Sequence, residues 1–342
     1  MTAWTDYLTR EGATLDHNTV SFGAAQADAA ALETGTVVVP LLHLGILQSV
    51  GPDSAPYLHN LFSNDVNKLA PEAVQWSSFN SPKGRMLASF LLWREAEGHS
   101  LVLAADIVPM MHKKLSMYIL RSKVKLADAS AERALIGVAG EDAAACLQRA
   151  GLPLPAADMQ QVDGDGALVI RLGAQQFIVV VPVSAAAELF AGLSAAGAVK
   201  AGTDTWQLAM IRAGLPLITA ATQEEFVAQM LNYELIGGVS FHKGCYPGQE
   251  IVARTQYLGK LKKRMYRVAL PAGTAPVAGN DLYSPAFGEQ SAGKLVNVAP
   301  AAGGGFEALA VMQSSCAESG EVHFGAVDGP LLGFLDLPYA LP

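Results

Sequence analysis

Apolar and polar residues follow one another in short runs along this chain, and glycine, proline or asparagine interrupts the runs at close intervals. Residues 36–47, TVVVPLLHLGIL, are β-branched and apolar and predict one or two short buried strands. Residues 72–106 predict three strands separated by turns at 80–84 and 97–98. Helices are predicted where an apolar stripe follows a capping residue, as it does after Asp106 and after Thr203.

Two stretches share a spacing at an offset of 89 residues. Gly51-x-Asp53-(x4)-Leu58 matches Gly140-x-Asp142-(x4)-Leu147, and in both a strand turns through glycine into a helix. The match favours a duplicated α+β unit. The alternative is that glycine followed by aspartate is simply common where a strand leads into a helix.

The pattern changes in the last third of the chain. Thr222 and Glu225 have the spacing of a capping box, so the segment TQEEFVAQMLN predicts a helix. After about residue 263, helical periodicity ends and short apolar pieces alternate with turn residues. That alternation predicts a small antiparallel barrel.

Composition narrows the class of protein. Hydrophobic residues make up 51% of the 342 residues, charged residues 16%, and the net charge is -8, which predicts a globular protein with no general attraction to nucleic acid or anionic membranes. The three cysteines show neither metal-ligand spacing nor a disulfide framework, so we expect no metal site and a reducing compartment. The charged N-terminal stretch and the short apolar runs lead us to expect no signal peptide, no membrane span and a cytoplasmic location.

Residues 237–259, GGVSFHKGCYPGQEIVARTQYLG, are the densest in reactive residue types. Cys245 follows Lys243 by two residues and precedes a helix predicted to start at Pro247. A nearby cation and a helix N-terminus both favour the thiolate, so Cys245 is a candidate functional thiol. On residue types alone, the alternative is an inert cysteine in an ordinary glycine-rich loop.

The segment KGCYPGQEIVAR resembles the K-G-C-Y-x-G-Q-E signature of the YgfZ family, folate-binding proteins related to the glycine-cleavage T-protein. The resemblance extends over residues 51–66, 79–94 and 211–241, and so over most of the chain. It implies an α+β fold of pseudo-duplicated ferredoxin-like units plus a C-terminal antiparallel β-barrel, arranged as a cloverleaf around a central folate-binding cavity. The expected domains are 1–130, 131–263, which carries the signature, and 264–342.

The resemblance also implies a function. It predicts an accessory protein that binds tetrahydrofolate or a derivative and supports the assembly or maintenance of iron–sulfur enzymes, including enzymes that modify tRNA. Those client enzymes are the expected partners, and we expect a monomer without direct tRNA or membrane binding. Cys245 and Lys243 are the expected functional thiol and its neighbour. The expected folate-binding residues are Lys83, Arg85, Arg212, Asn232, Tyr246, Gln249, Glu250 and Arg254.

Two other functions stay open at this point. An aminomethyltransferase needs a carboxylate near the reacting nitrogens of folate. T-proteins carry an acidic pair where this chain has KGRMLASFLLW, and a glutamate where it has Arg212, so we lean against this enzyme. A thiol enzyme would use Cys245 as nucleophile, with only His242 close by in the sequence.

One basic cluster also has two interpretations. Residues 259–267, GKLKKRMYR, carry Lys260, Lys262, Lys263, Arg264 and Arg267. The cluster fits a site for a folate polyglutamate tail or RNA, and it fits equally an exposed edge strand protected by charge.

Overall fold

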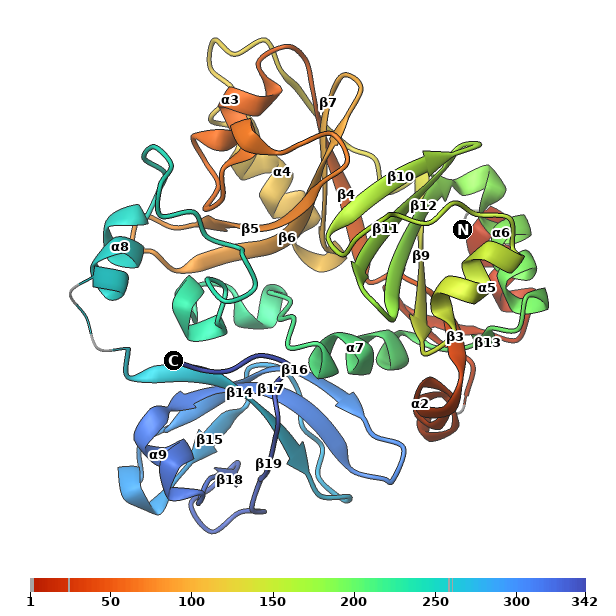
Figure 1. The fold of residues 1–342 in the computed structure, drawn as a ribbon. Helices are drawn as coiled ribbons and strands as arrows, with labels where there is room; N and C mark the ends of the chain where they lie inside the picture. The colour runs from red at the N-terminus through yellow and green to blue at the C-terminus, as the bar shows by residue number, and fades with distance from the viewer. Residues whose placement is uncertain (1–2, 24, 258, 260) are drawn as a thin grey trace. The chain divides into compact units, whose positions relative to one another are not determined.

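The structure, a computed structural model, describes residues 3–23, 25–257, 259 and 261–342 (Figure 1). The chain folds into two compact units. Unit 1 comprises Met1–Tyr57, Lys68–Gln75 and Leu91–Ala209, and unit 2 comprises Leu58–Asn67, Trp76–Phe90 and Met210–Pro342.

The first large sheet has the strand order β5-β6-β7-β4-β8. Its strands are β4 (Leu44–Val50), β5 (Val74–Asn80), β6 (Met86–Glu95), β7 (Gly98–Ala104) and β8 (Lys125–Asp128). Helices α3 (Ser54–His59) and α4 (Val108–Ser116) lie between them in the sequence. The three strands predicted within 72–106 are confirmed, and eight successive residues from Met86 are buried, so both faces of β6 are covered.

The second sheet repeats this succession with the order β10-β11-β12-β9-β3-β13 (Figure 1). Its strands are β3 (Thr36–Pro40), β9 (Arg133–Gly140), β10 (Gln160–Gly164), β11 (Ala167–Gly173), β12 (Gln176–Pro182) and β13 (Val199–Lys200). In both sheets three consecutive strands form a meander, and the strand that precedes them in the sequence pairs with the last of the three. Strands β4 to β7 therefore correspond to β9 to β12, and the order of strands agrees with the predicted duplication.

The two glycines of the repeated spacing occupy equivalent positions. Gly51 follows β4 with a φ of +131°, and Gly140 ends β9 with a φ of +125°. A β-carbon would lie 2.2 Å from the carbonyl oxygen of Lys123 at Gly51, and 2.0 Å from that of Gly35 at Gly140. Both positions therefore require glycine for the same two reasons, the backbone conformation and the close approach of another segment of backbone.

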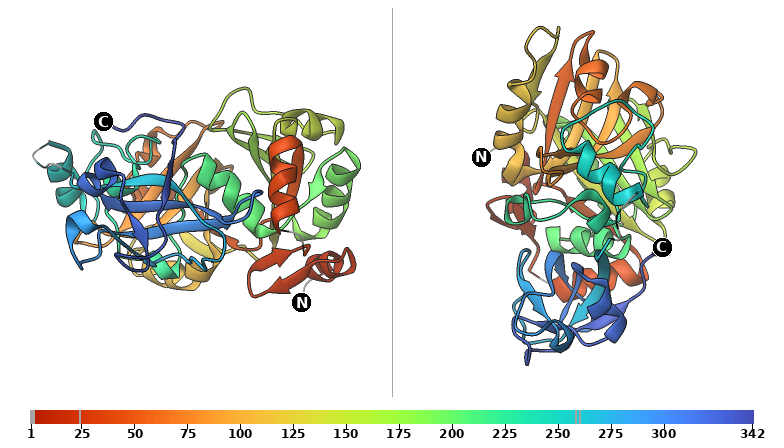
Figure 2. Two further views of the ribbon diagram at one scale, coloured as in Figure 1. Left: turned by 90° about the horizontal axis from the view of Figure 1, so that it is seen from below. Right: turned by 90° about the vertical axis from the view of Figure 1, so that its left-hand side faces the viewer.

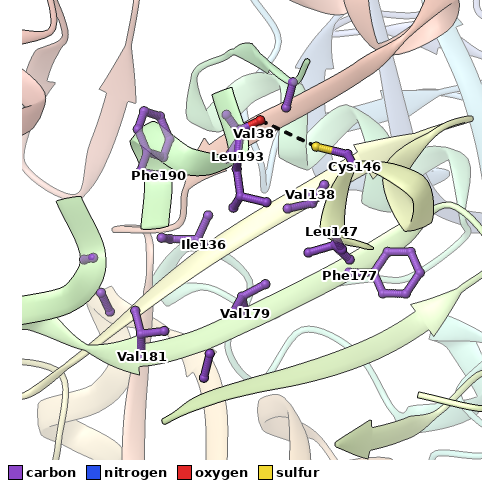
Figure 3. Close-up of a cluster of buried hydrophobic side chains, with 14 of the residues drawn as sticks. Val38, Ile136, Val138, Cys146, Leu147, Phe177, Val179, Val181, Phe190 and Leu193 are labelled. Atoms are coloured by element: carbon purple, nitrogen blue, oxygen red, sulfur yellow. Dashed lines mark hydrogen bonds between the residues drawn. The ribbon is translucent and has the colours of Figure 1, made fainter. Parts of the chain in front are cut away.

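Helices cover the second sheet and complete the core of unit 1 (Figure 3). Ile136, Val138 and Val179 of the sheet and Phe190 of α6 are all buried in this core. Each such side chain contributes about 1.5–3 kcal/mol through burial. The helices of unit 1 not yet named are α1 (Ala3–Arg10), α2 (Ala25–Thr34), α5 (Ala143–Arg149), α6 (Val183–Ala195) and most of α7 (Thr203–Arg212), and the hairpin β1 (Thr14–Asp16) and β2 (Thr19–Ser21) follows α1.

Unit 2 contains a curled antiparallel sheet with the order β18-β15-β16-β17-β14-β19 (blue in Figure 2). Its strands are β14 (Lys263–Leu270), β15 (Asp281–Tyr283), β16 (Gly293–Pro300), β17 (Phe306–Gln313), β18 (His323–Phe324) and β19 (Gly333–Leu335), and α9 (Ser314–Ser319) follows β17. Among the strand pairings of the described residues, none joins β18 to β19. The predicted C-terminal sheet is thus confirmed as a curled half-barrel, while its closure and the cloverleaf arrangement stay predictions.

The helix predicted from Thr222 is wrong: the segment forms the short 3₁₀ turns η3 (Ala220–Thr222) and η4 (Ala228–Leu231). The amide of Glu224 donates to the carbonyl of Met86 instead, at 2.9 Å, with a φ of +61° at Glu224. The three-domain division at residues 130 and 263 stays a prediction, and β3 pairs with β9 across the first of these boundaries.

Candidate functional site

The signature residues 243–250 form an irregular loop that leads into helix α8 (Gln249–Tyr257) of unit 2. Gly248 precedes the helix with a φ of +79°. The amide of Gln249 donates to the carbonyl of Tyr246 at 3.1 Å. The helix therefore starts two residues later than predicted, and its first residue lies four positions after Cys245 rather than two.

The three cysteines differ in exposure. Cys146 and Cys316 are buried, whereas Cys245 is exposed. The thiol of Cys146 donates to the carbonyl of Leu193 at 3.5 Å (Figure 3), and burial raises the pKa of this thiol. The interpretation as an inert apolar cysteine fits Cys146 and Cys316, but the signature cysteine is open to solutes.

Lys243 is an internal residue of the site and is 8% exposed. Its ammonium group donates to the carbonyl oxygens of His59, where α3 ends, and of Phe62. It also lies 4.9 Å from the ring centroid of buried Tyr246. Burial lowers the pKa of Lys243 to about 8, against the opposing charge of Asp65, and burial raises the pKa of Tyr246. Lys243 therefore ties the signature loop to the chain that follows α3.

A histidine that sequence spacing did not reveal lies at the same loop. Nδ1 of His59 is 3.1 Å from Oδ1 of Asp65, and both side chains are 14% exposed. Nε2 of His59 is 3.8 Å from the point that a β-carbon would occupy on Gly244, the residue before Cys245. The segment YLHNLFSNDV contains both residues, but nothing in its sequence indicates contact with a loop some 180 residues away. His242, the histidine closest in sequence, is exposed.

The turn at 80–85 packs against the start of α8 through two glycines. A β-carbon on Gly248 would lie 2.5 Å from the carbonyl oxygen of Ser81 and 2.7 Å from Cα of Gly84. A β-carbon on Gly84 would lie 2.8 Å from Cβ of Ile251 in α8. The structure thus brings together NSPKGR and the signature, two motifs that are far apart in the sequence.

The predicted ligand-binding cations of this turn differ in their contacts. Lys83 is exposed beside Gly84. Arg85 is half-buried, and its Nη1 donates to the carbonyl of Glu225. On α8, Glu250 and Arg254 are exposed and Gln249 is half-buried. Lys83, Gln249, Glu250 and Arg254 therefore belong to the same part of unit 2 as Cys245, and Arg85 is committed to the backbone.

The described residues contain neither a metal-binding cluster nor a helix that could span a membrane. Within 3–23, 25–257, 259 and 261–342, no three His, Cys, Asp or Glu side chains are grouped so as to hold a metal ion. In the same ranges, every helix is too short or too polar to cross a membrane.

The chain is similar to known families and proteins. The profile of the GCVT N-terminal domain matches residues 5–235. The tRNA-modifying protein YgfZ of Photorhabdus laumondii is 32% identical over 257 residues, which are 73% of this chain and 77% of that protein. The chain belongs to the YgfZ family. Glycine cleavage system aminomethyltransferase T from Bartonella henselae has a similar fold, with a TM-score of 0.81 over 99% of this chain and 98% of that chain, at 16% identity.

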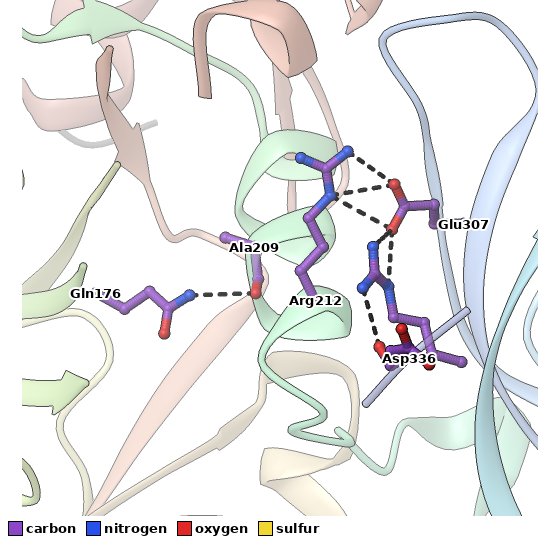
Figure 4. Close-up of polar contacts among 6 residues, drawn as sticks. Gln176, Ala209, Arg212, Glu307 and Asp336 are labelled. Carbon is purple, nitrogen blue, oxygen red and sulfur yellow. Dashed lines mark hydrogen bonds and ion pairs between the residues drawn. The ribbon is translucent and has the colours of Figure 1, made fainter. Parts of the chain in front are cut away.

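In this YgfZ-family chain, Arg212 stands where the T-protein resemblance predicts a glutamate, and it pairs with a carboxylate of its own unit. Its Nη2 and Nε lie 2.7 and 3.1 Å from Oε1 of Glu307 in β17, and Nη2 of Arg267 lies 2.7 Å from Oε2 (Figure 4). Burial raises the pKa of Glu307, but the hydrogen bonds and charges of the two arginines outweigh burial and hold it below its usual value. The guanidinium of Arg212 thus anchors the end of α7 to the curled sheet.

Asn232 also contacts the curled sheet. It is fully buried with a φ of +56°, and its Nδ2 donates to the carbonyl of Met265 at 2.9 Å. Its Oδ1 accepts from Nη1 of Arg264 at 3.2 Å, and that guanidinium also pairs with Glu234. The geometry separates the predicted residues into two groups, one at the turn and α8, and one, Arg212 and Asn232, at β14 and β17.

These contacts bear on the basic cluster 259–267. Arg264 and Arg267 are paired with Glu234 and Glu307. Lys262 is exposed, and Lys260 lies outside the described residues. Two of the five cations thus hold the sheet. Strand β14 pairs with both β17 and β19, so the interpretation of the cluster as an exposed edge strand is wrong.

Proposed function

We propose that this chain binds a reduced folate, tetrahydrofolate or a derivative, and acts as an accessory protein for iron–sulfur enzymes, including enzymes that modify tRNA. The observation that carries the proposal is the exposed signature thiol of Cys245 on a loop that is fixed to the turn at 80–85. The tRNA-modifying relative supports the link to tRNA.

Two buried polar atoms of the turn fit a ligand. Nδ2 of Asn80 and Oγ of Ser81 have no hydrogen-bond partner among the described residues. Oδ1 of Asn80 accepts from the hydroxyl of Ser78 at 3.0 Å, which fixes the amide so that Nδ2 remains the free donor. A buried polar group without a partner costs about 1–3 kcal/mol, so a ligand with matching polar atoms would be stabilised here.

In this proposal, Asn80 and Ser81 would hold polar atoms of the folate, and Lys83 and Arg254 would attract its carboxylates. Bound folate would serve as the carrier of one-carbon units. The chain's own contribution would be to bind and orient this molecule near the signature loop.

Aminomethyl transfer is the alternative that the residues support less well. No Asp or Glu lies between Pro82 and Trp93, and Arg212 occupies the other acidic position. Without a carboxylate at either place, the chain lacks the group that this chemistry requires for its protons.

Calorimetry and thermal denaturation with tetrahydrofolate test the binding. Ligand at 100 times its dissociation constant should add about 2.7 kcal/mol of stability. Ser81→Ala and Lys83→Gln should weaken binding, whereas Lys113→Gln, which changes an exposed lysine of α4 in unit 1, should not. Absence of both heat and thermal shift at millimolar tetrahydrofolate would refute the proposal, and turnover with the T-protein's own substrates would replace it by aminomethyl transfer.

A test in cells addresses the thiol. Cys245→Ser should leave the melting temperature nearly unchanged, because the side chain is exposed and its change costs roughly 0.5 kcal/mol or less. It should nevertheless fail to restore iron–sulfur enzyme activity in cells that lack the protein. Full restoration would show that the signature thiol has no chemical role.

The His59–Asp65 pair favours a second candidate function, nucleophilic chemistry at Cys245. A carboxylate that orients an imidazole beside a thiol is the usual arrangement for removing the thiol proton. If His59 acts on Cys245, His59→Gln should slow alkylation of Cys245 by iodoacetamide at neutral pH, because the thiolate is the nucleophile and the variant lacks the imidazole that takes its proton. Equal rates in both proteins at every pH would exclude this role for His59.

A further inference from the structure

A cavity lies entirely within unit 1 and has no assigned role. Its volume is about 650 Å³, within the range of about 300–1,000 Å³ typical of small-molecule sites. The end of β6, the start of β9 and strand β10 supply its polar lining, and β11 and β12 supply apolar residues. None of its lining residues belongs to the turn at 80–85 or to the signature loop.

One carboxylate of this cavity is already saturated. Oε1 of Glu95 accepts from the indole of Trp93 at 3.1 Å and from the hydroxyl of Ser100 at 2.7 Å, and it pairs with Nη1 of Arg133. Oε2 accepts from the amide of Gln48 at 3.3 Å. The charge of Glu95 is therefore matched within the protein and is not available to a ligand.

The arginines of the cavity retain donors. Arg133 uses only Nη1, toward Glu95 and Ser100, so its Nε and Nη2 have no partner among the described residues. In the same described ranges, the guanidinium of Arg94 forms no hydrogen bond or ion pair, and the side chain is exposed. Two guanidinium groups with spare donors are suited to a carboxylate.

The cavity also presents acceptors. Asp163 is exposed, and its carboxylate has no partner among the residues that the structure describes. Nε2 of Gln161 donates to the carbonyls of Pro71 at 2.6 Å and Arg94 at 2.9 Å, which fixes the amide, and its Oε1 is left buried without a donor. These oxygens are suited to an ammonium group.

We propose that this cavity binds a small zwitterion of the α-amino acid class. The carboxylate of such a ligand pairs with Arg94 and Arg133, its ammonium group faces Asp163, and its side chain packs on the apolar residues of β11 and β12. The formal charges of the lining, two arginines against Glu95 and Asp163, sum to zero. A simple anion would therefore leave Asp163 without an ionic partner, and a simple cation would leave the arginines without one. A zwitterion pairs with both the arginines and Asp163.

The test uses the full chain and the proteinogenic L-amino acids as individual probes, with binding measured by thermal shift and calorimetry. At least one amino acid should stabilise the protein. Arg94→Gln and Asp163→Asn, both at exposed positions that should not disturb folding, should each weaken its binding about tenfold or more. Arg121→Gln is the matched control, because Arg121 is also an exposed arginine of unit 1 but lies outside the cavity.

The corresponding amine, without the carboxylate, and the corresponding acid, without the ammonium group, should both bind more weakly than the amino acid. Absence of a shift with every amino acid would overturn the proposal. Binding that survives both substitutions would overturn it as well, and equal binding of the acid would show a simple anion site instead. Each of these results is independent of tetrahydrofolate binding in unit 2.

Discussion

Replacing Gly248 by alanine should destabilise unit 2 by more than the backbone conformation alone explains. At a φ of +79°, an alanine costs about 1–2 kcal/mol relative to glycine. Its β-carbon would lie 2.5 Å from the carbonyl oxygen of Ser81 and 2.7 Å from Cα of Gly84. Both neighbours are backbone atoms, so the clash requires the turn to move, and overpacking of this kind costs about 1–3 kcal/mol more. The total is about 2–5 kcal/mol of unfolding free energy.

Gly237→Ala is the matched control. Gly237 belongs to the same unit and has a φ of +72°, but no atom of the described residues lies within 4 Å of the point that its β-carbon would occupy. Only the conformational cost of about 1–2 kcal/mol should appear. Gly244→Ala, whose β-carbon would have an ordinary contact at 3.8 Å, should be close to neutral.

Urea unfolding of the three variants and the wild type measures the difference. The midpoints should fall in the order Gly244→Ala, Gly237→Ala, Gly248→Ala, from highest to lowest, with similar slopes. If Gly248→Ala and Gly237→Ala have the same midpoint, the turn and α8 do not pack glycine against glycine, and the placement of Lys83 beside the signature loses its basis.

Two further predictions concern buried charges. Burial lowers the pKa of Lys243 from 10.5 to about 8, so between these pH values the unfolded chain binds more protons and the folded state gains stability as the pH rises. Lys243→Met should lack this gain, and parallel pH profiles of the two urea midpoints would contradict the burial of the ammonium group. The pKa of Glu307 is held below its usual 4.5, so its stabilising contribution is present above that pH and is lost on acidification, and Glu307→Gln should flatten this loss. Arg212→Met should cost roughly 1–3 kcal/mol, because Glu307 loses a charged donor, and a neutral result in thermal denaturation would contradict the pairing.

Local features of the fold were predictable from the sequence. The strands within 36–47 and 72–106 follow directly from β-branched runs and turn residues. The equivalence of Gly51 and Gly140 was also predictable, because both adopt a positive φ and that local conformation depends on the glycine itself. The helix predicted after Thr222 failed for the opposite reason, since Met86 and Arg85 bind the backbone of Glu224 and Glu225 and override a local capping signal.

The site was predictable only in part, because its contacts join distant segments. The signature revealed Cys245, but no spacing rule connects it to His59 or connects Gly248 to Gly84. Arg212 and Asn232 are polar residues in a segment that resembles the family. The sequence could not show that Arg212 pairs with Glu307, or that Asn232 donates to the carbonyl of Met265. Long-range partners of this kind depend on the tertiary fold and not on local composition.

The signature residues fall into two groups, those that face the protein interior and those exposed to solvent. Lys243, Tyr246 and Gly248 face inward: a buried ammonium on two carbonyls, a buried ring beside it, and a glycine that admits the neighbouring turn. Cys245 and Glu250 face solvent. Substitution of an inward residue should therefore impair function through loss of the loop conformation, and a change in stability should accompany it. Loss of function at Cys245 without a change in stability would assign the chemistry to the thiol itself.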